Sequence, residues 1–482
     1  MRKIIGVILS IVLTINVAHA QIARPGAEGI GDPYFPTLGN GGYDAQHYTL
    51  DLSVDMENNI LSGTVTMQAQ ATQDLASFNL DFAGFTISDV TVNDAPARDY
   101  ERDGGELTIV PASPIASGSS FTSAVTYSGV PGEGVDIQGD IFSRGWTNYG
   151  DGVFVAAEPT GASLWYPVND HPLDKATYSF RITVPRPFVV AANGIQQDKI
   201  DNGAAITYVW EASQPIASYL VAVNIGNFAV QSEQTPSGVL IRNYFPADIA
   251  QQAAQTFSQT DEMIEYFSTL FGPFPFDVYG VAVADTNLPF ALEIQTLTLF
   301  GRETIDPDSW RSVGGPQGVI AHELAHQWFG DSVSLERWQD IWLNEGFATY
   351  ATLLWTEHTS GRAALNNVVR GIYDYVSSQQ NAPLAEITPP GSPPADNLFN
   401  DGVYERGALT LHALRLRVGD EAFFTILRTY AERFRYGNAS TDDFIAVAEE
   451  ISGKELGDFF DSWLYDEQMP AIPEMGLGQQ PL

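Results

Sequence analysis

The sequence predicts an α+β chain of more than one domain, in which a β-rich N-terminal domain is followed by a mainly α-helical domain. Three observations support this prediction. The chain has 482 residues, more than the ~100–200 residues typical of one domain. Its first half alternates apolar and polar residues with period two, and its second half repeats apolar residues at helical spacing. We place the two domains at residues 21–232 and 233–482.

The first twenty residues have the features of a secretory signal peptide. Arg2 and Lys3 precede an apolar run that ends at Val17, and Ala18-His19-Ala20 follows as an A-x-A cleavage site. The alternative is a membrane anchor, but the run is shorter than the ~20 apolar residues that a spanning helix needs. We therefore expect residues 1–20 to be removed and the mature protein to be periplasmic or extracellular, with no membrane anchor left after cleavage.

The charge and the absence of cysteine narrow the function classes. The formal net charge is −36, and it becomes −38 when the two cations of the leader are removed. So acidic a chain is an improbable partner for nucleic acid; it could attract cationic peptides, or the charge could serve only solubility or adaptation to salt. With no cysteine there is no disulfide, so the packed core and any bound metal must hold an exported fold together. The oligomeric state stays unknown at this point.

The N-terminal domain shows strand patterning along most of its length. Tyr48, Leu50 and Leu52 alternate with Thr49 and Asp51, which is typical of a strand with one buried face. Two later stretches repeat the pattern, at residues 65–69 and 178–184, and glycine-rich turns separate such stretches.

The pattern changes to a helical period from Ala250. The apolar residues spaced for one helical face are Phe257, Ile264, Phe267 and Phe271. A Gly-Pro pair at 272–273 ends this run. A short strand-like block at 278–300 follows, helical signals dominate beyond it, and residues 383–402 form a loop rich in Pro, Gly, Asn and Asp.

A short helix at residues 315–330 carries the most informative motif, H-E-x-x-H. His322 and His326 are four residues apart, so their imidazoles project from one face and can reach a common metal ion. Glu323 lies beside His322 and can point toward a water molecule on that ion. The alternative is a core helix that carries two histidines by coincidence, but the mature chain has only six.

A catalytic zinc site needs three protein ligands and one open position for water. The extended pattern H-E-x-x-H-x-x-G-x-x-H does not fit, because Phe329 and Ser332 occupy the positions of its Gly and its final His. A second helical segment at 338–350 offers Glu345, with eighteen residues between it and His326. We therefore expect one Zn²⁺ per chain on His322, His326 and Glu345, and manganese or cobalt could occupy the same ligands in vitro.

These motifs resemble those of the M1 family of zinc aminopeptidases. The family pattern H-E-x-x-H-x18-E corresponds to His322 to Glu345, and its N-E-G-F-A segment corresponds to Asn344 to Ala348. The resemblance extends over most of residues 43–470 and implies a saddle-like β-domain followed by a thermolysin-like catalytic domain. Few residues follow Leu464, so it also implies a short form without the large C-terminal helical domain of longer members, and with it a more open groove.

The resemblance implies two substrate-binding carboxylates. Phe290-Ala291-Leu292-Glu293-Ile294 stands in place of the family's G-A-M-E-N motif and keeps its Ala and Glu, which assigns Glu293 to the free amine of the substrate. A peptide amine has a pKa near ~8, so a fixed carboxylate can select chain termini. Residues 157–160 and 165–172 are similar to the segment that supplies a second amine contact, and Glu158 is the candidate for it, although Ala156 stands where several relatives carry Gln. His171 in that segment is interpreted as structural.

The resemblance also implies the catalytic residues. Tyr404-Glu405-Arg406-Gly407 is similar to the family's Y-E-K-G segment, which makes Tyr404 the donor to the oxyanion of the tetrahedral intermediate. A tyrosine hydroxyl can donate while neutral. Glu323 is then the general base that takes a proton from water and returns it to the departing amine.

The expected function is hydrolysis of the first peptide bond of peptides by a zinc aminopeptidase. A zinc endopeptidase and an epoxide hydrolase are alternatives that would use the same metal site, and what Glu293 recognises distinguishes them. An inactive, exported peptide-binding protein is the alternative from another class, but the complete set of motif residues argues against it. The sequence does not indicate which N-terminal side chain or which peptide length is preferred.

Overall fold

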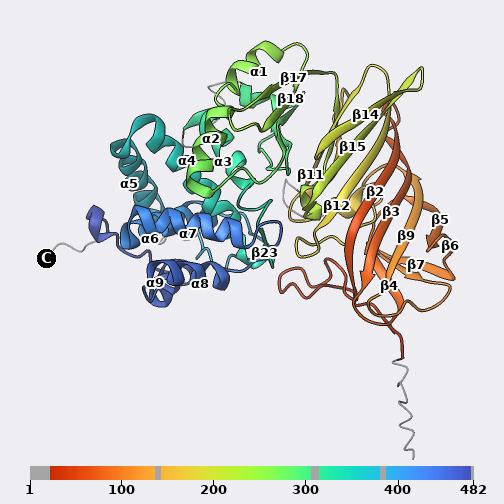
Figure 1. Cartoon of the computed structure of the whole chain (residues 1–482), viewed down its shortest axis with the longest axis horizontal. Coiled ribbons are helices and arrows are strands. Elements are labelled where there is room, and N and C mark those ends of the chain that lie inside the picture. The colour runs from red at the N-terminus through yellow and green to blue at the C-terminus, as the bar shows by residue number, and fades with distance from the viewer. Residues whose placement is uncertain (1–21, 136–142, 306–313, 380–386, 479–482) are drawn as a thin grey trace, which may run out of the picture.

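The computed structural model describes residues 22–135, 143–305, 314–379 and 387–478. The expected signal peptide, residues 1–20, lies outside these described residues. A β-rich half carries most of the strands, and a half that contains all the labelled helices lies beside it (Figure 1). This arrangement confirms the predicted α+β class, with a β-rich N-terminal domain followed by a mainly helical one.

The largest sheet of the N-terminal domain has eight strands in the order β14-β15-β12-β2-β3-β9-β5-β6. Its strands are β2 (Tyr43–Asp55), β3 (Ile60–Ala71), β5 (Thr86–Val92), β6 (Ala95–Pro96), β9 (Ser120–Gly129), β12 (Ala176–Pro185), β14 (Ile195–Asp201) and β15 (Ala205–Ile216). Tyr48, Leu50 and Leu52 of β2 are at most 1% exposed, whereas Asp51 and Ser53 face solvent. The alternation in the sequence therefore buries one face of this sheet, as predicted.

Two smaller sheets complete the N-terminal domain, in the orders β1-β4-β8-β7 and β10-β11-β16-β13. Their strands are β1 (Arg24–Pro25), β4 (Leu75–Asp81), β7 (Asp99–Asp103), β8 (Glu106–Val110), β10 (Ser143–Asn148), β11 (Val153–Ala157), β13 (Val189–Ala192) and β16 (Val223–Gly226). Strand β11 is buried along its whole length between β10 and β16. Glu158 follows it directly, so a central strand fixes the position of this predicted site residue.

A mixed sheet of five strands begins the second half of the chain. Its members are β17 (Phe228–Gln234), β18 (Leu240–Pro246), β19 (Val278–Tyr279), β20 (Val281–Ala284) and β21 (Thr298–Gly301). The strands β17 and β18 form an antiparallel hairpin, and β18 continues the sheet by pairing in parallel with β19 and β20. The boundary expected after residue 232 falls within β17, and it stays a prediction.

Helices make up most of the remaining chain. They are α1 (Ala250–Thr256), α2 (Thr260–Phe271), α3 (Gly315–His326), α4 (Trp342–Ser360), α5 (Arg362–Gln379), α6 (Gly407–Val418), α7 (Asp420–Arg433), α8 (Thr441–Ser452) and α9 (Gly457–Leu464). Short helical turns are η1 (Ala162–Leu164), η2 (Ser218–Leu220), η3 (Arg302–Ile305), η4 (Trp338–Asp340), η5 (Gly402–Arg406) and η6 (Pro473–Met475), and the strands β22 (Ser334–Leu335) and β23 (Asn438–Ala439) pair. The helical run that the sequence predicts from Ala250 is divided between α1 and α2.

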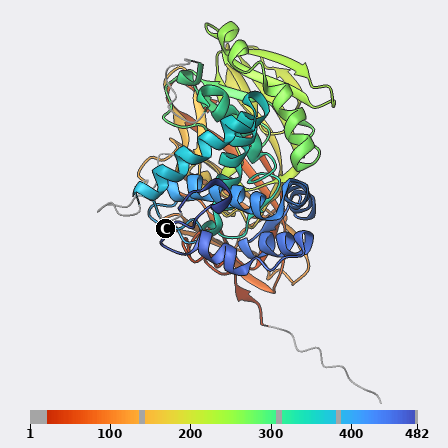
Figure 2. The same ribbon diagram turned by 90° about the vertical axis from the view of Figure 1, so that its left-hand side faces the viewer.

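The two halves are joined by buried polar contacts. The carboxylate of Asp32 accepts a hydrogen bond from the Trp338 amide at 2.9 Å and lies 3.1 Å from His171 Nε2. Lys175 Nζ donates to the main-chain oxygen of Asp331 at 2.7 Å and to that of Ser332 at 3.1 Å. The loop that follows α3 is thus held against the N-terminal domain. When the helical half faces the viewer, its helices lie in front of the sheets (Figure 2).

None of the helices in the described ranges combines the length and the apolar character that crossing a bilayer requires.

Candidate active site

The helix α3 brings two histidines together. It begins after Gly314, which has a φ of 82°, and it carries a proline in its first turn, where a missing amide proton costs nothing. His322 and His326 lie one turn apart, and their Nε2 atoms are separated by 3.1 Å. Two ring nitrogens at this distance point at one place in space.

Glu345 completes a group of three donor atoms. It stands in the first turn of α4, and its Oε2 lies 3.1 Å from His322 Nε2 and 3.4 Å from His326 Nε2. A tetrahedral zinc ion with bonds of ~2.0–2.1 Å holds its ligands roughly 3.3 Å apart. The separations therefore fit one zinc ion, and the donor set of two imidazoles and one carboxylate suits it.

The surroundings of the two histidines favour positive charge at the place where their Nε2 atoms meet. His326 Nδ1 donates to the main-chain oxygen of Phe329 at 3.1 Å, so its Nε2 lone pair is free for a metal. Burial lowers the pKa of His322. Burial would also lower the pKa of His326, but carboxylates led by Glu293 and Glu345 raise it well above its usual value. The site as a whole favours positive charge.

Three carboxylates from distant parts of the chain meet next to this group. Their oxygen atoms lie within 4.8 Å of one another, and the residues are Glu158, Glu293 and Glu345. Glu158 Oε1 and Glu293 Oε1 are buried and accept no hydrogen bond from any described residue. Burial raises the pKa of Glu293 to about 7 and that of Glu158 well above its usual value. The basic group nearest to Glu293 Oε1 among the ion pairs of the described residues is His326 Nδ1, at 4.0 Å, so a cationic group that reaches these two buried carboxylates would stabilise them.

The pKa values of Glu345 and Glu323 are shifted in opposite directions. Burial opposes ionisation of Glu345, but the imidazole of His326, followed by that of His322, lowers the pKa of Glu345 to about 2. Glu323 is 6% exposed, and its Oε2 accepts no hydrogen bond from the described residues. Burial raises the pKa of Glu323 well above its usual value, with the nearby Glu293 and Glu345 adding to the effect. The histidines thus favour the ionised form of Glu345, whereas burial favours the protonated form of Glu323.

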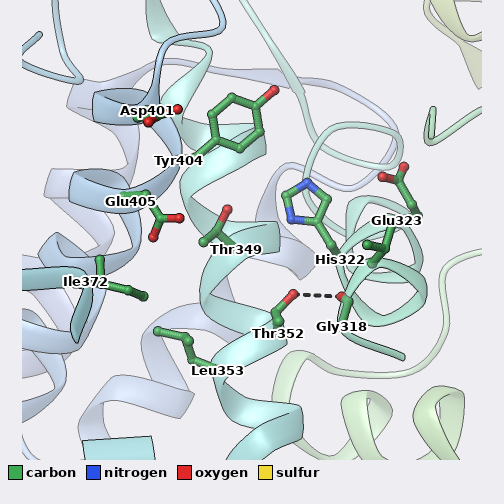
Figure 3. Close-up of a pocket in the computed structure, with 11 residues that line it drawn as sticks. Gly318, His322, Glu323, Thr349, Thr352, Leu353, Ile372, Asp401, Tyr404 and Glu405 are labelled. Carbon is green, nitrogen blue, oxygen red and sulfur yellow. Dashed lines mark hydrogen bonds between the residues drawn. The ribbon is translucent and has the colours of Figure 1, made fainter. Parts of the chain in front are cut away.

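Tyr404 lies over the metal-ligand group from a π-helical turn, η5, a form that is frequent at functional sites. Its ring stacks on that of His322, with centroids 6.1 Å apart and an interplanar angle of 20° (Figure 3). Two glycines allow the start of α6, directly after η5, to pack closely against α4, because a Cβ on Gly346 would lie 3.0 Å from the Gly407 Cα. Burial raises the pKa of Tyr404 well above its usual value, so its hydroxyl keeps its proton.

The structure brings all seven predicted site residues together. They are Glu158, Glu293, His322, Glu323, His326, Glu345 and Tyr404. His171 lies outside this group and contacts Asp32 instead.

No motif in the sequence indicated the residues that hold the loop of Glu293 in place. Gln327 Nε2 donates to the main-chain oxygen of Glu293 at 3.1 Å, and Gln327 Oε1 accepts from the Thr296 amide at 2.8 Å. Asn193 donates to the main-chain oxygen of Gln295 at 2.8 Å. Gln327 directly follows the second histidine of the motif, so its place near the site was open to prediction. Asn193 has no comparable signal.

Comparison with known proteins agrees with this geometry. The family model "Peptidase M1 N-terminal domain" matches residues 44–220, and "Peptidase family M1 domain" matches residues 255–463. Aminopeptidase M1 of Arabidopsis thaliana is 25% identical over 89% of this chain and 50% of its own length. Endoplasmic reticulum aminopeptidase 1 of Homo sapiens is 26% identical over 82% of this chain and 44% of its own. The chain spans about half the length of these curated relatives, or less.

Solved structures match over nearly the whole chain. An M1 zinc metallopeptidase mutant of Deinococcus radiodurans, bound to a Tyr-Ser-Ala substrate, has 31% identity and a TM-score of 0.81. The match covers 93% of this chain and 100% of that one. The unmutated metallopeptidase of the same organism matches with a TM-score of 0.80 over 92% and 99% of the two chains. By sequence, fold and site, this chain belongs to peptidase family M1.

Proposed function

We propose that the protein is a zinc aminopeptidase that hydrolyses the first peptide bond of peptides with a free N-terminus. The observation that carries this proposal is the group of three buried carboxylates, Glu158, Glu293 and Glu345, beside the histidines. The relatives support it, because several are named aminopeptidases and one solved neighbour is bound to a tripeptide.

His322, His326 and Glu345 would hold one zinc ion per chain. When bound there, zinc supplies the Lewis acidity that activates a water molecule and polarises the scissile carbonyl. The chain provides the matching electrostatics, because the carboxylates around His326 favour positive charge at this position.

Glu323 and Tyr404 would carry out the proton transfer and the charge stabilisation. Glu323 has a pKa raised by burial, so it can take the proton of the attacking water and deliver it to the departing amine. The hydroxyl of Tyr404 remains protonated and can donate to the oxyanion that develops on the carbonyl oxygen. The stacking of Tyr404 on His322 places this donor beside a metal ligand.

Glu158 and Glu293 would fix the register of the substrate. A peptide ammonium group, with a pKa near ~8, would bring a positive charge to these two buried carboxylates. An ammonium held there leaves the first carbonyl of the peptide next to the metal ligands. Only one residue lies between the ammonium group and the first peptide bond, so each reaction cycle removes one residue.

The test compares a free peptide with its N-acetylated form. Acetylation removes the charge-assisted hydrogen bonds to two carboxylates, so kcat/KM should fall by at least about 100-fold. Glu293→Gln should reduce this discrimination, and Glu101→Gln, at an exposed position on β7, is the matched control that should retain it. Equal cleavage of the free and the acetylated peptide by the wild type would disprove the amine-binding role and favour an endopeptidase.

We also propose that the protein is exported and cleaved after Ala20. The charged N-terminus, the apolar run and the A-x-A site support this. Fractionation of a bacterial host and N-terminal sequencing of the product should yield a periplasmic or secreted protein that begins at Gln21. An uncleaved chain in the cytoplasm would contradict the proposal.

A further inference from the structure

A cavity of about 350 Å³ opens directly from the metal-ligand group. This volume lies within the range of ~300–1,000 Å³ typical of ligand pockets. The helices α3, α4 and α5 and the turn η5 supply its walls, as seen in Figure 3. Eleven residues line the cavity, and Figure 3 draws them as sticks.

The lining residues show which part of a substrate would occupy the cavity. His322, Glu323 and Tyr404 belong to the lining, but Glu158 and Glu293 do not. The cavity therefore lies on the side of the metal ligands away from the amine-binding carboxylates. Since Glu323 returns a proton to the departing nitrogen under the proposed function, the residue that follows the scissile bond lies on this side. The side chain of this residue would therefore enter the cavity.

The walls combine apolar side chains with unneutralised acid. Val319, Leu353 and Ile372 supply apolar surface, and neither Lys nor Arg is among the lining residues. Glu405 Oε2 is inaccessible to solvent and accepts no hydrogen bond from the described residues. In Figure 3 the Glu405 carboxylate points from η5 toward Thr349, across the cavity.

The second acid of the wall already has a partner. Asp401 accepts a hydrogen bond from the hydroxyl of Tyr375. Burial, with a contribution from Asp401, raises the pKa of Glu405 to about 7. A buried carboxyl group without a partner is costly, and a cationic group that reaches it removes this cost. Lysine and arginine suit such a cavity, because an apolar stem carries their charged end.

We propose that this cavity receives the side chain of the second residue of the peptide, and that Glu405 makes the enzyme prefer lysine or arginine there. The preference rests on the proposed aminopeptidase function, and it names a class of substrate for that function. Peptides with an acidic second residue should be the poorest substrates, because two carboxylates would then face each other in the cavity.

The experiment uses tripeptide amides of the form Ala-X-Ala, with X as lysine, arginine, norleucine or glutamate. One charge-assisted hydrogen bond should raise kcat/KM for lysine about 10- to 100-fold over norleucine, which has a similar stem without the charge. Ala-Ala-Lys amide has the same net charge as Ala-Lys-Ala amide and should lack most of this gain. Equal gains for the two peptides would assign the preference to the acidic surface as a whole and overturn the proposal.

Two variants test the role of Glu405. Glu405→Gln should reduce the ratio of lysine to norleucine to within about 3-fold, and this ratio cancels any general loss of activity. Glu421→Gln, at an exposed position on α7, should keep the wild-type ratio. A full lysine preference in Glu405→Gln would refute the assignment. If this variant does not fold, the wild-type series still decides, because norleucine equal to lysine refutes the proposal.

Alanyl arylamide separates the two proposals, because it has no second amino acid. Its hydrolysis tests the aminopeptidase function alone. If the wild type cleaves it but shows no preference among the tripeptides, only the inference about the cavity fails. If neither the arylamide nor any of the tripeptide amides is cleaved, the proposed function itself fails.

Discussion

Tyr404→Phe tests the catalytic geometry most cleanly, because it removes one oxygen atom and leaves the ring. The ring of Tyr404 stacks on His322 at a centroid distance of 6.1 Å, and phenylalanine can keep this contact. Within the described residues no hydrogen bond to the Tyr404 hydroxyl is present. The free energy of unfolding should therefore change by no more than about 0.5 kcal/mol.

The catalytic effect of Tyr404→Phe should be much larger. Loss of one oxyanion donor typically lowers kcat by about 10²- to 10³-fold, or about 2.7–4 kcal/mol of activation free energy. Initial rates with alanyl arylamide measure this change, and calorimetry and zinc content establish that the variant is folded and loaded. A fully loaded variant with kcat within about 3-fold of wild type would refute the assignment of Tyr404 as the oxyanion donor.

Three further changes probe the base, the pH response and the domain contact. Glu323→Gln should keep its zinc and lose about 10²- to 10⁴-fold in kcat; loss of zinc would contradict its role as a base outside the ligand set. Burial, followed by the charge of Glu28, raises the pKa of Glu106 to about 7, so the native state retains a proton that the unfolded chain releases above about pH 4.5. This contribution of Glu106 to wild-type stability is therefore lost as the pH rises from about 4.5 to about 7. Glutamine does not titrate, so the Tm of Glu106→Gln minus that of wild type should be larger at pH 8 than at pH 5. The same Tm difference at both pH values would refute this. Lys175→Met removes two hydrogen bonds to the loop after α3 and should lower the free energy of unfolding by about 1–3 kcal/mol in denaturant titrations, and an unchanged value would show that the contact is not stabilising.

Local patterns predicted the elements and part of the site. The alternation around Leu50 corresponds to a strand with one buried face, because the side-chain period of a strand is two. The spacing of His322 and His326 gave their common direction, because both lie on one short helix. Glu345 was found through an interval that a helix hairpin can close, and the structure places its carboxylate 3.1 Å from His322.

Long-range geometry was beyond a single sequence. The resemblance suggested Glu158 and Glu293 as site residues. Their oxygen atoms lie within 4.8 Å of that of Glu345, and this proximity depends on how the two domains pack. The division of the helical run near Phe257 has no strong sequence signal, because buried contacts on both sides of the break outweigh weak local propensities. The cavity beside Glu405 was also not predicted, because its walls come from four separate segments.

The proposed function depends on a single zinc ion bound by two imidazoles and one carboxylate. Elemental analysis of purified wild type and of a His322→Ala variant, both dialysed with excess zinc and then freed of unbound metal, tests this directly. We expect about one zinc per wild-type chain and a large loss of bound zinc in the variant, with the protein still folded. Folded wild type without stoichiometric zinc, or a variant that retains the full amount, would contradict it.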